Sequence, residues 1–160
     1  MAVIRQAHRE DCPKILQFIQ ELAEYEKEPD AVEASVATLE EAIFDKKQAN
    51  AVLVEEEGES IGFALYFFNF STWRGRAGLY LEDLYVQPSY RGKGYGKMLL
   101  SYLASQAVKN NCPRFEWIVL NWNKPSIDFY QAMGANPLSE WTVYRLENEA
   151  LQALAKSYKE

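Results

Sequence analysis

SYRGKGYGKMLL, residues 89–100, places three glycines and three cations directly in front of an apolar run. Glycine adopts positive φ without strain and lets the backbone approach a ligand closely, which Gly92, Gly94 and Gly96 offer at alternate positions. The apolar residues that follow recur at helical spacing and predict a helix that ends near Lys109. Because free N–H groups and the helix dipole attract anions at such a start, the segment predicts a pyrophosphate site.

Two common phosphate-binding motifs do not fit this segment. A P-loop needs Gly-Lys-Ser/Thr and a further glycine five positions earlier. Here Gly96-Lys97 is followed by Met98, and Arg91 stands at the earlier position. A dinucleotide fingerprint needs Gly-x-Gly-x-x-Gly, and Lys97 or Leu99 replaces its last glycine. A glycine-rich turn with solvated cations and no ligand is the remaining alternative.

The rest of the chain alternates strand and helix signals around this segment. Its 160 residues suffice for one domain, so we expect a single domain over 1–160 with a mixed sheet covered by helices, an α/β (α+β) fold. Predicted strands cover 3–5, 51–56, 61–70, 77–86, 115–120 and 141–146, with a turn at 58–59. Predicted helices follow Asp11, cover 36–44, lie between Asn123 and Gly134, and cover 149–158.

Composition narrows the class of protein. The net charge is −6, which argues against nucleic acid and is compatible with a cationic partner. No stretch approaches the roughly 20 apolar residues of a membrane span, and the N-terminus lacks a secretory core, so we expect a cytoplasmic protein. A single His8 and the absence of zinc spacing predict no metal site, and Cys12 and Cys112 are expected to be reduced thiols.

Three motifs in chain order resemble the GNAT superfamily of N-acetyltransferases. Arg91-x-x-Gly94-x-Gly96 after a strand resembles the family's coenzyme A loop, and residues 4–15 resemble its opening strand and helix. Asn123-x-x-Ser126-x-x-Phe129-Tyr130-x-x-x-Gly134 resembles its closing helix. The resemblance implies the GNAT fold, a central, mostly antiparallel mixed sheet with splayed central strands, and acetyl transfer from acetyl-CoA to an amine.

Within this superfamily the chain is most similar to the diamine acetyltransferases, which include spermidine/spermine and thialysine acetyltransferases. Residues 80–83, 90–92 and 122–130 carry that resemblance. It implies a small cationic amine as substrate: a diamine, a polyamine or a thialysine-like amino acid. Ser71 stands where polyamine-specific members have an acidic residue, which favours small diamines or thialysine-like amino acids.

The resemblance also assigns catalytic roles. An alkylammonium has a pKa of about 10.4, so the amine must lose a proton before it attacks. Glu82 is the candidate base, directly or through a water, or else the residue that holds the ammonium. Glu82 and Asp83 are neighbours on a strand and cannot face one pocket unless the strand bulges, which the family pattern implies. Tyr130 is the candidate general acid for the departing thiolate. A solvated carboxylate and a core tyrosine are the alternatives.

The remaining site residues fall into two groups. The resemblance assigns coenzyme contacts to the main chain of a strand end, to the glycine segment and to the closing helix: Leu84, Tyr85, Val86, Arg91, Gly92, Lys93, Gly94, Tyr95, Gly96, Lys97, Asn123, Ser126 and Tyr130. Amine contacts are predicted for Tyr25, Glu26, Glu82 and Asp83, and for Trp73 through a cation–π contact.

Other functions remain open from the sequence. The same chemistry could act on a protein lysine or N-terminus, and a coenzyme-binding module without turnover is a third possibility. The presence of both Glu82 and Tyr130 favours catalysis over the module. The resemblance further suggests a homodimer, and neither a membrane nor a nucleic acid is expected as a partner.

Overall fold

The computed structural model describes residues 1–159, which form two compact units, Met1–Leu120 and the chain from Asn121 onward. The first unit contains a sheet in the order β1 (Ala2–Gln6), β2 (Asn50–Glu56), β3 (Glu59–Ser71), β4 (Arg76–Val86) and β5 (Phe115–Glu116). Neighbouring strands are antiparallel except β4 and β5, which are parallel. The predicted mixed, mostly antiparallel sheet is therefore confirmed.

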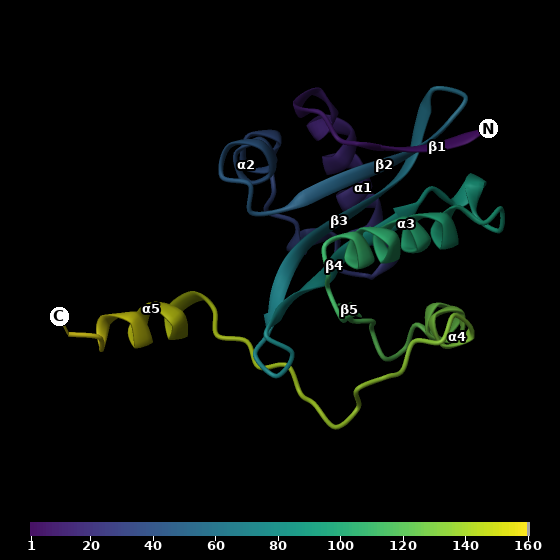
Figure 1. The fold of residues 1–160 in the computed structure, drawn as a ribbon. Coiled ribbons are helices and arrows are strands. Elements are labelled where there is room, and N and C mark those ends of the chain that lie inside the picture. Colours follow the sequence, from purple (N-terminus) through teal and green to yellow (C-terminus); the bar gives the residue numbers. More distant parts are fainter. Residues whose placement is uncertain (160) are drawn as a thin grey trace. The chain divides into compact units, whose positions relative to one another are not determined.

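Helices cover both faces of this sheet (Figure 1). They are α1 (Cys12–Tyr25), α2 (Val36–Glu40), which continues as the π-helical turn η3 (Glu41–Asp45), and α3 (Tyr95–Lys109). Leu53, Phe63 and Tyr85 are paired across three strands and form a buried core with α1, where Phe18 stacks on Phe63 at 5.7 Å between ring centroids. Because strand side chains alternate between faces, their neighbours form a second buried layer that faces α3.

The central strands separate beyond a short contact. β5 pairs with β4 only at Leu79–Phe115 and Tyr80–Glu116. Within the described residues, the outer edge of β4 has no strand partner after Tyr80. An unpaired strand edge exposes N–H and C=O groups that an extended ligand can pair with.

The second unit contains α4 (Lys124–Ala132) and α5 (Asn148–Lys156). Asn123 caps α4 as predicted, since its Oδ1 accepts a hydrogen bond from the Ser126 amide at 3.4 Å. Gly134 follows α4 with a φ of 93°, a left-handed conformation that glycine adopts readily, and this confirms the predicted stop.

Several predicted boundaries differ from the structure. The β2–β3 turn lies at Glu57–Gly58, one residue earlier than predicted, and the strand predicted over 115–120 ends at Glu116. The strand predicted over 141–146 is wrong, because this segment has no regular structure and its side chains are exposed. Three short 3-10 helices were not predicted: η1 (Arg9–Asp11), η2 (Pro29–Ala31) and η4 (Pro88–Tyr90). None of the described helices is long and apolar enough to cross a membrane.

Candidate active site

A β-bulge in β4 places two carboxylates on one face of the sheet. Leu65 pairs with Asp83 and the next residue, Tyr66, pairs with Leu81, which leaves Glu82 without a partner on β3. Alternation from Leu81 turns Glu82 toward the α1 face, and pairing with Leu65 places Asp83 on that same face. The strand therefore has the bulge that Glu82 and Asp83 need in order to face one pocket.

Glu26 completes an acidic cluster, which we define as Glu26, Glu82 and Asp83. Glu26 is the C-cap of α1, and its amide bonds to the Leu22 carbonyl oxygen at 2.9 Å. Burial and then the charges of Glu82 and Glu26 raise the pKa of Asp83 to about 6. Burial and the charge of Glu82 also raise the pKa of Glu26. The three groups therefore lie within electrostatic range of one another.

Salt bridges within Met1–Leu120 do not neutralise this cluster. None of those described in this unit involves Glu26, Glu82 or Asp83. The described side chains also contain no His, Cys, Asp and Glu group arranged to hold a metal ion. Like charges held together at a partly buried position favour a cationic ligand, and an alkylammonium is such a cation.

The glycine turn, residues 91–97, leads directly into α3. Gly92 and Gly94 have φ values of 77° and 89°, and no atom lies within 4 Å of where their Cβ atoms would be. Gly94 is the N-cap of α3, so no side chain caps the helix, and its first turn contains no acidic residue. Unoccupied space, free N–H groups and nearby lysines together fit a diphosphate group.

Side chains of the glycine turn make varied contacts. The Tyr95 hydroxyl donates a short hydrogen bond to Glu56 and the Lys93 ammonium lies 5.4 Å from the Tyr90 ring centroid. Arg91 is exposed, yet its guanidinium lies over the rings of Tyr25 and Tyr85, a contact that sequence reasoning missed. No spacing between residues 25, 85 and 91 signals this contact, since it depends on how α1 packs against β4.

The strand end that leads to this turn contains the other predicted coenzyme contacts. Leu84 is half-buried, while Tyr85 and Val86 are buried, and all three lie on the part of β4 whose outer edge has no strand partner. The Val86 carbonyl oxygen accepts a hydrogen bond from Arg91 Nε at 2.9 Å. Glu82 and Asp83, the unpaired strand edge and the glycine turn are thus consecutive along one strand-to-helix segment.

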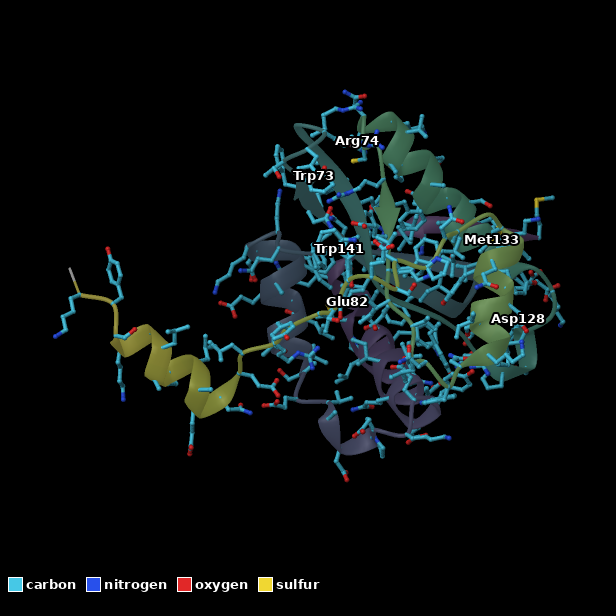
Figure 2. All side chains as sticks on the ribbon, turned by 90° about the horizontal axis from the view of Figure 1, so that it is seen from below. Trp73, Arg74, Glu82, Asp128, Met133 and Trp141 are labelled. Atoms are coloured by element: carbon cyan, nitrogen blue, oxygen red, sulfur yellow. The ribbon has the colours of Figure 1, made fainter. Side chains whose placement is uncertain are left out.

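The hairpin end between β3 and β4 is separate from the acidic cluster. Trp73 lies in this turn with 88% of its surface exposed, and Figure 2 labels it together with Glu82. Glu82 lies six residue steps along β4 from Arg76, which corresponds to roughly 20 Å. Ser71 is buried, and its hydroxyl accepts a hydrogen bond from the Arg74 amide at 3.1 Å. Neither residue meets the cluster within this unit.

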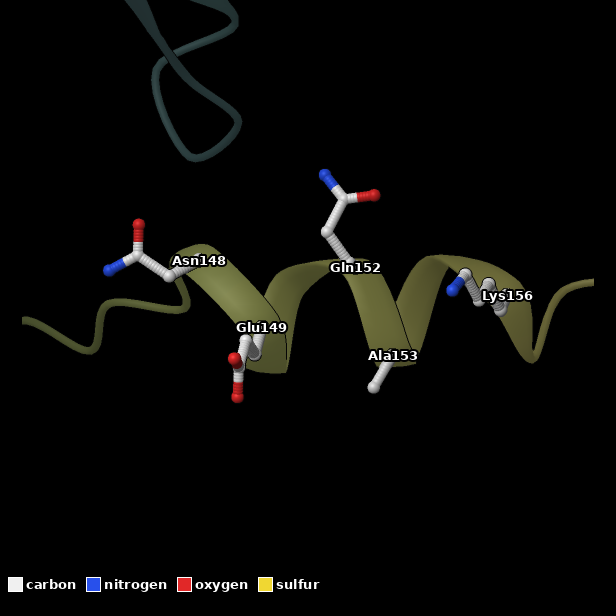
Figure 3. Close-up of a pocket in the computed structure, with 5 residues that line it drawn as sticks. All are labelled: Asn148, Glu149, Gln152, Ala153 and Lys156. Atoms are coloured by element: carbon white, nitrogen blue, oxygen red, sulfur yellow. The ribbon is translucent and has the colours of Figure 1, made fainter.

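The predicted residues of the second unit lie on and before α4. Asn123 is buried and Tyr130 is half-buried, with the rings of Phe129 and Tyr130 5.8 Å apart. The Tyr130 carbonyl oxygen accepts bonds from Met133 and Ala135 at the helix end. A shallow groove elsewhere in this unit follows one face of α5 (Figure 3) and contains none of the predicted residues. It is lined by Asn148, Glu149, Gln152, Ala153 and Lys156.

Comparison with known proteins gives matches over nearly the whole chain. The acetyltransferase (GNAT) family model matches residues 4–135. A thialysine N-epsilon-acetyltransferase of Bos taurus is 41% identical over 165 residues, 96% of each chain. The spermidine/spermine N(1)-acetyltransferase-like protein 1 of Homo sapiens is 36% identical over 95% of this chain and 23% of its own length. The structure of an integron cassette protein from the mobile metagenome of V. cholerae has a TM-score of 0.82 at 30% identity, with 98% of each chain covered.

Proposed function

The chain belongs to the acetyltransferase (GNAT) family and is an acetyl-CoA-dependent N-acetyltransferase, and on that premise we propose that it acetylates the terminal amine of a thialysine-like amino acid or small diamine. One observation carries the choice of acceptor: the acidic cluster gathers three carboxylates around one position, and no salt bridge described within Met1–Leu120 neutralises them. An alkylammonium that enters such a cluster is attracted by all three carboxylates. The thialysine acetyltransferase relatives support the same class of substrate.

Ser71 supports a short acceptor over a long polyamine. Its hydroxyl holds the Arg74 amide in the hairpin turn and supplies no charge. A polyamine has further ammonium groups beyond the one that reacts, and each gains from its own carboxylate. Since the acidic residue expected for polyamine binding is missing at position 71, spermidine and spermine should be the poorer substrates.

The acidic cluster has two tasks in this proposal. Asp83 and Glu26, which are the more buried members, hold the ammonium and lose their raised pKa when it binds. Glu82 is exposed and accepts the proton that the ammonium must release, through a water. The neutral amine then forms the new N–C bond with the acetyl carbonyl carbon, the nitrogen loses its second proton to water, and the bond from that carbon to sulfur breaks, which leaves a thiolate to be protonated.

The donor is proposed to bind along the β4 edge and the glycine turn. Main-chain groups of Leu84, Tyr85 and Val86 pair with the pantetheine as a strand would, and the amides of residues 91–97 hold the diphosphate. Asn123 and Ser126 are proposed as further contacts by the resemblance of their helix, although the structure uses both in the α4 cap. Lys93 and Lys97 add positive charge to the turn.

Tyr130 is proposed to protonate the departing thiolate, on the resemblance of the helix motif that contains it. A phenol with an ordinary pKa of about 10 is protonated at neutral pH and can donate to sulfur. We expect Tyr130→Phe to lower kcat about a hundredfold at saturating substrates. Tyr158→Phe is the matched control, because Tyr158 is 77% exposed in the same unit. Equal turnover in the two variants would exclude the role.

A homodimer is the proposed assembly. The segment over 141–146 is rich in residues that favour strands, yet it pairs with no strand among the described residues and exposes Trp141, Val143 and Tyr144. An exposed apolar segment of this kind is usually covered in solution. Light scattering after gel filtration should give twice the 18.4 kDa chain mass. A monomer at micromolar concentration would contradict the proposal.

The acceptor is tested by the rate of coenzyme A release with a panel of amines. The panel contains thialysine, lysine, putrescine, spermidine, spermine and a lysine peptide at equal concentration. We expect thialysine to give the highest kcat/KM, and spermidine and spermine to give lower values. A peptide preferred over every free amine would instead indicate a protein acetyltransferase. If the protein binds acetyl-CoA but releases no coenzyme A in the presence of any amine of the panel, the proposed acceptor class is rejected.

A further inference from the structure

Arg91 connects three parts of the first unit that are distinct in the sequence: the glycine turn, β4 and the end of α1. Its Nε donates to the Val86 carbonyl oxygen at 2.9 Å. Its guanidinium carbon lies 5.3 Å from the Tyr25 ring centroid and 5.4 Å from that of Tyr85, within the range of a cation–π contact. One side chain at the start of the glycine turn therefore contacts both β4 and the last residue of α1.

The surfaces that hold Arg91 are themselves fixed. The Tyr85 hydroxyl donates to Glu21 Oε1 at 2.8 Å, and the Tyr85 ring lies 5.9 Å from that of Phe18 in the core. Glu21 and Tyr25 are four residues apart on α1 and therefore share a face of the helix. The last turn of α1 is thus attached to β4 through Glu21 and to the glycine turn through Tyr25.

This attachment bears directly on the acidic cluster. Glu26 follows Tyr25 along the chain and caps α1. Burial and the like charge of Glu82 both disfavour an ionised Glu26 at its position, so the repulsion tends to move the helix end away from the bulge. The Arg91–Tyr25 contact opposes that movement, because it holds the residue next to Glu26 against β4.

We propose that Arg91 is a positioning residue that couples donor binding at the glycine turn to the placement of Glu26 at the amine pocket. The inference rests on the proposed function for the identity of the pocket. When a coenzyme diphosphate orders residues 91–97, Arg91 is held over Tyr25, and the end of α1 becomes more rigid. The donor then prepares the acceptor side before the amine binds.

Hydrogen exchange of the α1 end tests the coupling without an acceptor. The amides of Glu26 and Glu28 bond to the carbonyl oxygens of Leu22 and Ala23, and they report on this turn. Saturating coenzyme A should slow their exchange in the wild type. In Arg91→Lys, which keeps the charge but loses the planar stack, the slowing should disappear at both amides and persist in α3. Equal slowing in both proteins would overturn the proposal.

Kinetics gives the second readout. Arg91→Lys should raise the KM for thialysine about tenfold and change the dissociation constant of coenzyme A by less than about twofold, since stacking is lost and charge is kept. An unchanged KM for thialysine together with a raised dissociation constant for coenzyme A would show that Arg91 acts only as a diphosphate ligand. Arg9→Lys is the matched control, because Arg9 lies 5.6 Å from the Phe44 ring centroid on another part of the surface.

A second variant distinguishes loss of the Arg91–Tyr25 contact from a general loss of folded protein. Tyr25→Leu removes the other half of the contact and should raise the thialysine KM by a similar factor. The double variant should be no worse than either single one, because both remove the same interaction. Additive effects would contradict the coupling. If the wild type acetylates no amine in the panel, the proposed acceptor fails, while hydrogen exchange still decides the role of Arg91.

Discussion

The glycine turn and the acidic cluster share one strand-to-helix segment, which contains the turn and two of the three carboxylates, but they depend on different interactions. The turn is local: Gly92 and Gly94 adopt positive φ, and α3 begins immediately after them. The cluster is assembled from distant parts of the chain, since it needs a bulge in β4 and the end of α1. A short sequence motif is therefore sufficient for the first region, whereas the second requires the folded unit.

The two regions also differ in how they affect stability. The turn has space at each glycine and contains conformations that glycine adopts without strain. The cluster is held against burial and like-charge repulsion, which raise the pKa values of Asp83 and Glu26. Substitutions in the two regions should therefore change the free energy of unfolding in opposite directions. Replacement of a glycine in the turn should lower it, and replacement of a carboxylate in the cluster should raise it. Both kinds of substitution should impair activity.

Gly94→Val should have the largest effect. A β-branched residue at a φ of 89° is strained by about 1–3 kcal/mol, and relief of that strain moves the amides that begin α3. We expect the dissociation constant of coenzyme A, measured by calorimetry, to rise about a hundredfold, near the upper end of that range. Gly58→Val is the matched control, because Gly58 has a φ of 81° in the β2–β3 turn. Similar affinity in both variants would refute the diphosphate assignment.

The glycine turn could be predicted because its information is local. Helix propensity, the cap at Gly94 and the cations can be read from residues 89–100 alone. The same holds for the Asn123 cap and the Gly134 stop of α4. The bulge at Glu82 is predicted only by the family resemblance, and the burial of Asp83 is not predicted by the sequence. Burial depends on which helix covers the strand, and no short window contains that information.

Predictions of non-local pairing were the least successful. Residues 141–146 contain Trp141, Val143 and Tyr144, which favour strands, but no neighbouring strand in their unit pairs with them. Residues after Glu116 likewise continue a strand-like pattern beyond the point where β5 leaves β4. The ring contacts of Arg91 were missed for a related reason, since a cation beside glycines suggests an anion before it suggests two tyrosine rings.

Asp83→Asn should stabilise the protein at pH 7. The pKa of Asp83 in the folded state, about 6, lies above its ordinary value of 3.8. Its contribution to stability is thus fully present below about pH 3.8 and is lost as the pH rises through 6. We expect a gain of about 2 kcal/mol in urea unfolding at pH 7, and none at pH 3.5.

A matched substitution separates this effect from a general loss of negative charge. Asp30 is an exposed carboxylate in η2 of the same unit. Asp30→Asn should change the free energy of unfolding by less than about 0.5 kcal/mol at either pH. Equal gains in the two variants would show that net charge, rather than the environment of Asp83, determines the result.

Glu82→Gln should have a smaller effect, confined to the acceptor side. Loss of one carboxylate removes a charged partner of the ammonium and the proton acceptor, so kcat/KM for thialysine should fall about tenfold. The dissociation constant of coenzyme A should stay within about twofold of the wild-type value. Removal of the Glu82 charge should also lower the raised pKa values of Asp83 and Glu26, so the acidic limb of the pH profile should move to lower pH. Glu59→Gln, at the exposed start of β3, is the control, and a matching loss there would remove Glu82 from the mechanism.

Trp73→Ala should have the smallest effect of all. The ring is 88% exposed at the hairpin end, roughly 20 Å along β4 from the bulge, so it should not reach an amine held by the acidic cluster of its own chain. We expect the thialysine KM to change by less than about twofold, as for an ordinary surface substitution. A tenfold rise would mean that Trp73 reaches the pocket from a second subunit, as a homodimer permits. That rise should then disappear when the enzyme is diluted below its dimer dissociation constant, whereas a contact within one chain does not depend on concentration.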